Sequence, residues 1–328
     1  MKILVDAMGG DLAPRETVMG ALEAGREGIG IILVGDRDRI MGEIAGPVPE
    51  NVEVIHAAET ILMGEQPVNA VRKKRDSSIV RCVQLLKEGA GSAFVSAGST
   101  GAVMAASLLG LGRIKGIDRP AIASVIPGER GGTVLLDVGA NVDCKPKNLV
   151  QFAIMGSLYA EKILEIDAPR VGLLNIGEEE SKGNELTLGA FPLLKQSRLN
   201  FIGNVEGRDI FSGMADVVVC DGFTGNVVLK SSEGLAMSLM RMIREELTRN
   251  WLSKMGTALA FPALNQIKRR TDYAEYGGAP LLGVNGVVIV CHGSSTSHAV
   301  KNAVMVAAGA VRSGLLDAIR ENIDKVGC

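Results

Sequence analysis

The stretch DVVVCDGFTGNVVLK, residues 216–230, decides how the chain is expected to fold. Residues 217–220 form a short, apolar, β-branched run, which is typical of a buried strand, and a turn rich in Gly, Asn and Asp follows it. Gly222 and Gly225 allow the backbone of this turn to approach a ligand closely. Lys230 lies one helical turn beyond Asn226 if a helix starts here. The stretch therefore predicts either an anion site at a helix N-terminus or a tight strand–helix turn without a ligand.

The same pattern, an apolar run followed by a polar, glycine-containing turn, recurs along the chain. Runs at 93–96, 133–138, 171–176, 201–205 and 287–291 end in such turns, and helical segments lie between them, the last at about 297–323. Strands that alternate with helices indicate an α/β fold with a mostly parallel sheet, which binds ligands beyond the carboxyl ends of its strands. We therefore expect the polar turns to converge on one edge of the sheet and to form one composite site.

Composition and charge restrict the class of protein. The chain of 328 residues is long enough for one large domain, and we expect a single α/β catalytic domain over 1–328. The net charge of −2 gives no electrostatic footprint for nucleic acid, so no nucleic-acid partner is expected. The five cysteines are scattered without CxxC spacing, which predicts neither a zinc site nor a disulfide framework and fits a reducing cytosol. Asp6 interrupts the N-terminal apolar run, so no signal peptide is predicted and a cytoplasmic location is expected.

One segment, 235–270, does not follow the alternation of strands and helices. It is helical by period, with Leu239, Ile243, Leu247 and Trp251 at four-residue steps, and we expect a protruding helical hairpin. Two interpretations stay open. The hairpin packs on the core or on a second subunit, or it is an amphipathic element that lies on a membrane surface with flanking Arg and Lys side chains.

Several common catalytic motifs are missing from the sequence. There is no complete GxGxxG fingerprint, no P-loop, no HExxH and no GxSxG. Only one of the three histidines, His292, lies at the end of a predicted strand beside Gly and Ser. Histidine-dependent catalysis therefore has few candidates.

Ten short blocks, spread in order over essentially the whole chain, resemble the PlsX family of bacterial phosphate acyltransferases. The blocks are VDAMGGD (5–11), SAGSTG (96–101), KGIDRP (115–120), DVGANVD (137–143), LNIG (174–177), KGNE (182–185), NVE (204–206), DGFTGN (221–226), YGGA (276–279) and HGSS (292–295). One position departs from the family pattern, which usually has Asn where this chain has Ser99.

The resemblance implies a fold, an activity and a set of partners. The implied fold is a three-layer α/β/α arrangement with a mostly parallel sheet, similar to isopropylmalate dehydrogenase and phosphotransacetylase. The implied reaction moves a long-chain acyl group from acyl carrier protein to inorganic phosphate, and the acyl phosphate feeds phospholipid synthesis through a membrane glycerol-3-phosphate acyltransferase. A homodimer and peripheral association with an anionic membrane surface are implied as well, whereas no metal or organic cofactor is expected.

The chemistry of this reaction fits the predicted turns. Phosphate is a nucleophile at neutral pH and a thiolate leaves readily, so the site has to hold a dianion, stabilise an oxyanion and exclude water. We expect Lys182, Asn204, Asn226 and His292 to be catalytic. The expected substrate-binding residues are Gly98, Ser99, Thr100, Gly101, Asn175, Asn184, Asp221, Thr224, Lys230 and Ser294.

Basic residues provide candidate docking surfaces for the acidic acyl carrier protein. The first set lies in the hairpin and contains Arg241, Arg244, Arg249, Lys268, Arg269 and Arg270, which anionic lipid could equally contact. A second basic run at 72–75 precedes a predicted helix and is either a solvated face or a contact for phosphate or an acidic partner.

Two rival functions remain open from the sequence. An oxidoreductase of the isopropylmalate-dehydrogenase type would share the architecture, and metal-dependent NAD reduction would reveal it. A non-catalytic scaffold would bind acyl carrier protein and membrane without releasing acyl phosphate.

Overall fold

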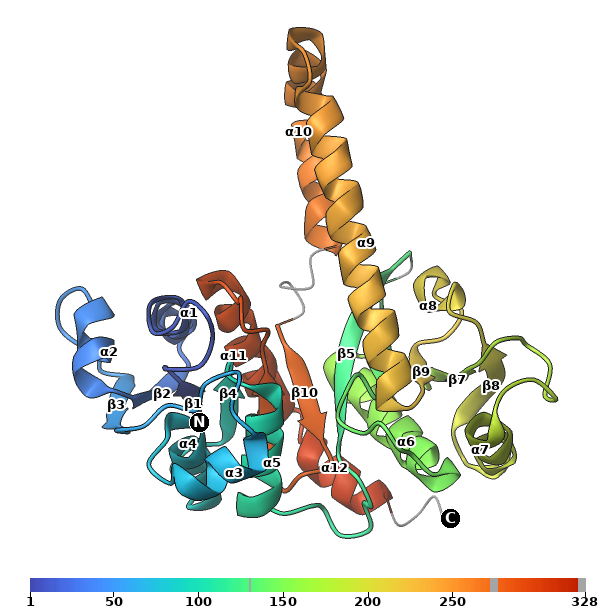
Figure 1. Ribbon diagram of the computed structural model, residues 1–328, viewed down its shortest axis with the longest axis horizontal. Helices are drawn as coiled ribbons and strands as arrows, with labels where there is room; N and C mark the ends of the chain where they lie inside the picture. The colour runs from blue at the N-terminus through green and yellow to red at the C-terminus, as the bar shows by residue number, and fades with distance from the viewer. Residues whose placement is uncertain (130, 272–276, 324–328) are drawn as a thin grey trace.

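The computed structural model describes residues 1–129, 131–271 and 277–323, together with their side chains except those of 267–271. Within this part of the chain, eleven strands form one sheet in the order β3-β2-β1-β4-β11-β10-β5-β6-β9-β7-β8 (Figure 1). The strands are β1 (Lys2–Asp6), β2 (Gly30–Gly35), β3 (Val52–His56), β4 (Ala93–Ser96), β5 (Ala121–Gly128), β6 (Gly131–Leu136), β7 (Arg170–Leu174), β8 (Asn200–Val205), β9 (Val217–Val219), β10 (Ala279–Leu282) and β11 (Val287–Val290).

Helices cover both faces of the sheet, which confirms the expected three-layer α/β/α fold. They are α1 (Arg15–Arg26), α2 (Arg37–Glu43), α3 (Pro67–Lys73), α4 (Ser78–Lys87), α5 (Thr100–Gly110), α6 (Pro146–Ile163), α7 (Glu185–Gln196), α8 (Asp209–Ser212), α9 (Gly222–Thr248), α10 (Trp251–Thr271), α11 (Ser297–Arg312) and α12 (Leu315–Asn322). On one face α3, α4, α5, α8 and the first turns of α9 pack against the sheet, and the other face carries α1, α2 and α11 over one half and α6, α7 and α12 over the other.

The strands of the two halves run in opposite directions. β11 pairs parallel to β4, β6 pairs parallel to β9, and β10 and β5 join the halves through three antiparallel pairings. The expectation that all polar turns meet on one edge of the sheet is therefore wrong. The register nevertheless brings two sets of turns together. β11 ends at Val290 and β6 ends at Leu136, and across the paired strands each of these ends lies within two residues of Ile122 on β5.

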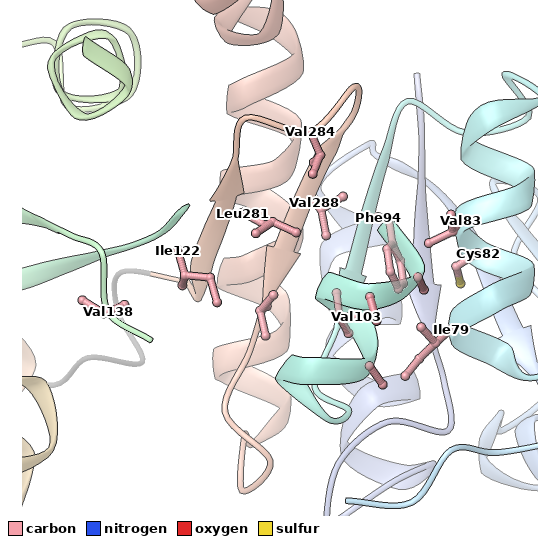
Figure 2. Packing of buried hydrophobic residues seen from close by; sticks show 14 of the residues in the cluster. Ile79, Cys82, Val83, Phe94, Val103, Ile122, Val138, Leu281, Val284 and Val288 are labelled. Carbon is pink, nitrogen blue, oxygen red and sulfur yellow. The ribbon is translucent and has the colours of Figure 1, made fainter. Parts of the chain in front are cut away.

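One hydrophobic cluster continues across this junction. Figure 2 shows Phe94 and Val103 from β4 and α5, Leu281 from β10 and Ile122 from β5 on the same face of the sheet. Val138, just after β6, belongs to the same buried cluster. The two oppositely directed halves thus share a core, and the turns at their meeting point are fixed relative to one another.

The segment expected as a hairpin, 235–270, is helical in the structure, but its first helix begins earlier. α9 runs without a break from Gly222 to Thr248, and α10 packs back along it, so that the pair projects from the body (Figure 1). The single C-terminal helix expected at 297–323 is two helices, because Gly314 adopts a left-handed conformation with φ of 66° between α11 and α12. In the described part of the chain, no single helix is long and apolar enough to span a membrane.

Candidate active site

A cavity of about 310 Å³ lies where the strand ends of the two halves meet. Its lining contains both polar and apolar side chains. The polar lining side chains are Thr100, Ser124, Asn226, Lys230, Glu233 and His292, and the larger apolar ones are Ile122, Val125, Val138, Leu229, Val290 and Cys291. Four of the predicted site residues, Thr100, Asn226, Lys230 and His292, therefore share one cavity although they come from three distant segments of the chain.

The first turns of α9 form one wall of the cavity. Asp221 is the N-cap of the helix, and its carboxylate accepts hydrogen bonds from the Thr224 N–H at 2.9 Å and from Thr224 Oγ1 at 2.7 Å. These two residues hydrogen-bond to each other and so shape the turn, and neither lines the cavity. Asn226 and Lys230, one helical turn apart, line it instead.

Two glycines allow α9 to begin directly on the loop that follows β6. A Cβ atom on Gly225 would lie 2.0 Å from the carbonyl oxygen of Asp137, and a Cβ atom on Gly222 would lie 2.6 Å from that of Asn141. The Gly222 N–H donates to this Asn141 oxygen at 2.7 Å. Any side chain at either position would push the helix, and with it Asn226 and Lys230, away from the sheet.

Asp137 organises this loop and was not among the predicted site residues. Its fully buried carboxylate accepts five hydrogen bonds, from the N–H groups of Ile122, Gly139, Ala140 and Asn141 and from Asn141 Nδ2. Burial raises the pKa of Asp137, and these hydrogen bonds oppose that rise. In the sequence, the signal that could have identified Asp137 was its position at the end of an apolar run.

A second buried carboxylate, Asp6, holds the turns of the other half. Asp6 accepts from the Met8 N–H at 3.1 Å and from Ser96 Oγ at 2.7 Å, and Ser96 Oγ in turn accepts from the Gly98 N–H at 3.0 Å. Burial raises the pKa of Asp6, opposed by these hydrogen bonds. The network fixes the turn that presents Thr100 to the cavity.

The other predicted residues of this turn have structural contacts. Ser99 caps α5 by accepting from the Ala102 N–H at 3.4 Å, and Gly98 and Ser99 are both buried. A Cβ atom on Gly101 would lie 2.7 Å from the Pro67 ring, so this glycine permits α3 to pack against α5. Among residues 98–101, only Thr100 lines the cavity.

His292 enters the cavity from the end of β11. Its Nδ1 lies 2.8 Å from Ser294 Oγ and 3.3 Å from the Ser294 N–H, which donates to it. An Nδ1 that accepts this hydrogen bond favours the neutral tautomer with its proton on Nε2. Ser294 therefore orients the imidazole, and it does not itself line the cavity.

Lys230 is the cation of the cavity, and Glu233 is its partner. Lys230 Nζ lies 2.8 Å from Glu233 Oε2, with both side chains partly exposed. Such pairs contribute little to stability, so an anion can replace Glu233 at low cost. Glu233 was missed from the sequence although it lies seven residues after Asn226, on the same helical face.

Four predicted residues lie around the loop between β7 and α7, and none of them lines the cavity. Asn175 Nδ2 donates to the Lys182 carbonyl and Asn204 Nδ2 donates to the Glu179 carbonyl, both at 2.9 Å. Asn184 is the N-cap of α7 and accepts from the Thr187 N–H at 3.0 Å. The three amides close the loop, and catalytic roles for Asn204 and Lys182 stay predictions. Within the ten sequence blocks, Tyr276 is the one residue that lies outside the described part of the chain.

The fold is shared with a solved phosphotransacetylase. The structure of a phosphotransacetylase from Streptococcus pyogenes superposes with a TM-score of 0.65 and 19% sequence identity, and the match covers 95% of this chain and 94% of that one. At this identity the likeness establishes the architecture alone.

Sequence comparison establishes the family. The chain is 60% identical to a phosphate acyltransferase from Pelotomaculum thermopropionicum, over 99% of this chain and 96% of the relative, and 58% identical to one from Heliobacterium modesticaldum, over 98% of each. The family model described as "Fatty acid synthesis protein" matches residues 1–317. These relatives set aside the oxidoreductase and the non-catalytic scaffold as rival functions, because all of them are named as transferases. The chain therefore belongs to the fatty acid synthesis protein family, the PlsX family of phosphate acyltransferases, and is a transferase.

Proposed function

We propose that the chain transfers a long-chain acyl group from acyl carrier protein to inorganic phosphate and releases acyl phosphate for phospholipid synthesis. The observation that carries this proposal is the mixed lining of the cavity, in which Lys230, Asn226 and His292 occur together with Ile122 and Val138. The polar side chains suit an anion and a polarised carbonyl, whereas the apolar side chains suit the first methylenes of an acyl chain.

Direct attack by phosphate suits the groups in the cavity. Lys230 exchanges Glu233 for phosphate, and the phosphate oxygen forms a bond to the thioester carbon. Asn226 stabilises the oxyanion, the C–S bond breaks, and the departing thiolate, which accepts a hydrogen bond from His292 Nε2–H, takes up the proton that the attacking hydrogenphosphate loses. Burial raises the pKa of Cys291 to about 12, so its thiol stays protonated at neutral pH and does not compete as a nucleophile.

The decisive experiment is mass-spectrometric detection of acyl phosphate from acyl carrier protein loaded with a fatty acid, inorganic phosphate and the purified chain. Asn226→Ala and His292→Ala should each lower the rate by about 10²–10³ if they act in the transition state. Lys182→Ala tests the remaining prediction for a residue that does not line the cavity, and a loss of similar size would mean that Lys182 also acts on the substrates. If Asn226→Ala and His292→Ala fold and retain the parent rate, the reaction takes place elsewhere.

Membrane association belongs to the same proposal, since the product is used at a membrane. Several large apolar side chains of the hairpin are exposed, among them Trp251, Leu259 at 87% exposure and Phe261 at 63%. Co-sedimentation with anionic vesicles should be strong for the parent and weak for Leu259→Glu/Phe261→Glu. Equal partitioning of the two proteins would overturn this part of the proposal.

We also propose that the chain is a homodimer in which the exposed apolar faces of α9 and α10 contact a second copy. Leu235, Met242 and Ile243 are exposed along α9, and such a surface on a projecting helix is typical of an interface. Sedimentation velocity of the parent and of Met242→Glu/Ile243→Glu tests this. A parent that sediments as a monomer would contradict it.

A further inference from the structure

The loop after β3 and the helix α3 pack against the turns that carry Thr100 and His292, two residues that line the cavity. Pro67, the first residue of α3, touches Gly101, since its Cγ lies 2.7 Å from the place of a Cβ there. Met63 Cε lies 2.6 Å from the place of a Cβ on Gly293, the residue after His292. This segment therefore contacts both turns that present polar groups to the cavity.

The outer side of this segment is apolar and basic, and we call it the α3 rim. Leu62, Met63 and Val68 are exposed by 63%, 48% and 48%. The inner face of α3 is occupied by Ala70 and Val71, which are buried. The exposed cations beside the apolar side chains are Arg72, Lys73 and Arg75.

These cations are not neutralised by their own segment. Lys74, the fourth cation of the run, bonds to Glu65 Oε1 at 2.6 Å and to the Thr60 carbonyl at 2.8 Å. Among the described residues, no ion pair is formed by Arg72, Lys73 or Arg75, and the neighbouring Asp76 pairs with Arg81 at 3.6 Å. The rim is thus a local positive surface on a chain whose net charge is −2.

Helix stability explains only part of this surface. Arg72 and Lys73 lie in the last turn of α3, where cations interact favourably with the helix dipole. Arg75 lies beyond the helix, so the helix dipole does not account for it, and it does not account for the exposed Leu62 and Met63 either. Apolar side chains ringed by unpaired cations are typical of a docking surface for an acidic protein.

We propose that the α3 rim is the docking surface for the acidic acyl carrier protein, which rests on the proposed function of the cavity. A carrier bound here delivers its thioester past Thr100 and His292. The hairpin is less suitable, because Arg244 lies 14 residues beyond Lys230 on α9, or roughly 21 Å along the helix. Figure 1 shows the hairpin projecting away from α3, so a membrane at the hairpin tip leaves the α3 rim open to a soluble carrier.

The test compares charge-reversed proteins with two acyl donors. Arg72→Glu/Arg75→Glu should raise the KM for acyl carrier protein about tenfold or more, whereas the KM for phosphate and the rate with acyl-pantetheine, which has no carrier, should not change. The matched control is Arg26→Glu/Arg312→Glu, which makes the same change of charge in the last turns of α1 and α11 on the opposite face of the sheet. Arg72→Gln/Arg75→Gln should give an intermediate KM, and this guards against loss of α3 in the glutamate variant.

Direct binding separates failure of the docking proposal from failure of the proposed function. Fluorescence anisotropy of labelled acyl carrier protein should show tighter binding to the parent and the matched control than to Arg72→Glu/Arg75→Glu, even if no acyl phosphate forms. Equal affinities, or a loss confined to Arg241→Glu/Arg244→Glu in the hairpin, would overturn the docking proposal. If Arg72→Glu/Arg75→Glu loses binding to anionic vesicles but keeps the parent's affinity for the carrier, the α3 rim binds lipid, and the docking proposal is overturned as well.

Discussion

Replacing Gly225 with Ala should destabilise the protein although the residue lies inside a helix. Alanine in place of an exposed helical glycine normally stabilises by about 1 kcal/mol. At Gly225 the added Cβ would lie 2.0 Å from the Asp137 carbonyl oxygen and 2.9 Å from Cys220 Sγ. The contact with Asp137 decides the sign of the effect.

The size of the effect follows from how firmly Asp137 is held. A carbon–oxygen contact of about 3.3 Å would require a displacement of roughly 1.3 Å. The oxygen belongs to a residue whose side chain accepts five hydrogen bonds and whose N–H donates to the Cys220 carbonyl at 3.1 Å. Overpacking at such a position costs about 3 kcal/mol, which outweighs the gain of about 1 kcal/mol in helix propensity and leaves about 2 kcal/mol of destabilisation.

Gly234→Ala is the matched control in the same helix. No atom lies within 4 Å of the place of its Cβ, so this variant should be about 1 kcal/mol more stable than the parent. For a chain of 328 residues, the difference of about 3 kcal/mol between the two variants corresponds to roughly 4–5 °C in Tm. Calorimetry at equal protein concentration measures it, and acyl-phosphate formation should fall in Gly225→Ala because the displaced helix carries Asn226 and Lys230. A Tm for Gly225→Ala at or above that of Gly234→Ala, with full activity, would refute the close packing of α9 on this loop.

Three other variants test the groups of the cavity. Lys230→Met should lower kcat/KM for phosphate by about 10²–10³ in steady-state assays, with the KM for the acyl donor little changed. Glu233→Gln should lower the KM for phosphate by roughly two- to fivefold, because it removes the competitor of a partly exposed ion pair, and an unchanged KM would mean that Lys230 does not meet phosphate. Asp137→Asn should reduce the free energy of unfolding in urea by about 2–4 kcal/mol, since an amide cannot accept from all the donors around it, and a stability equal to that of the parent would contradict its role in the loop.

The strands with an apolar run and a glycine turn were predictable from the sequence, whereas the two strands that join the halves were not. β4 lies at the predicted residues, and β9 and β11 are each one residue shorter than predicted. β5 and β10 contain Pro127 and Pro280, and proline within a run argues against a strand. Both are nevertheless paired, because Pro127 lies at the hairpin end of β5 and Pro280 pairs antiparallel with Ile289. Without these two strands the direction of the second half could not be predicted.

The types of residue in the candidate site were predictable from the sequence, but which of the candidate residues line the cavity was not. Asn175 and Asn184 lie in polar turns and Asn204 lies near the end of β8, in sequence patterns that resemble the one around Asn226, but their amides bond to nearby backbone. A side-chain amide in a turn can bind a ligand or close the loop, and the local sequence is the same in both cases. Only the tertiary arrangement, in which β6 and β11 end at the same level, separates the two roles.

Within α9, however, helical spacing alone is enough to separate the residues that face the cavity from those that shape the turn. Asn226, Lys230 and Glu233 follow one another at four and three residues, which places them on one face of a helix. Asp221 and Thr224 precede this face as a capping pair, three residues apart, and an acidic N-cap that bonds to the third residue after it is a feature of helix starts in general. Phe223 and Val227 lie next to this face, do not line the cavity, and are exposed by 62% and 50%. The same helix that lines the cavity thus carries apolar side chains outward from its first turn, and these continue toward the hairpin, where a second copy or a membrane can cover them.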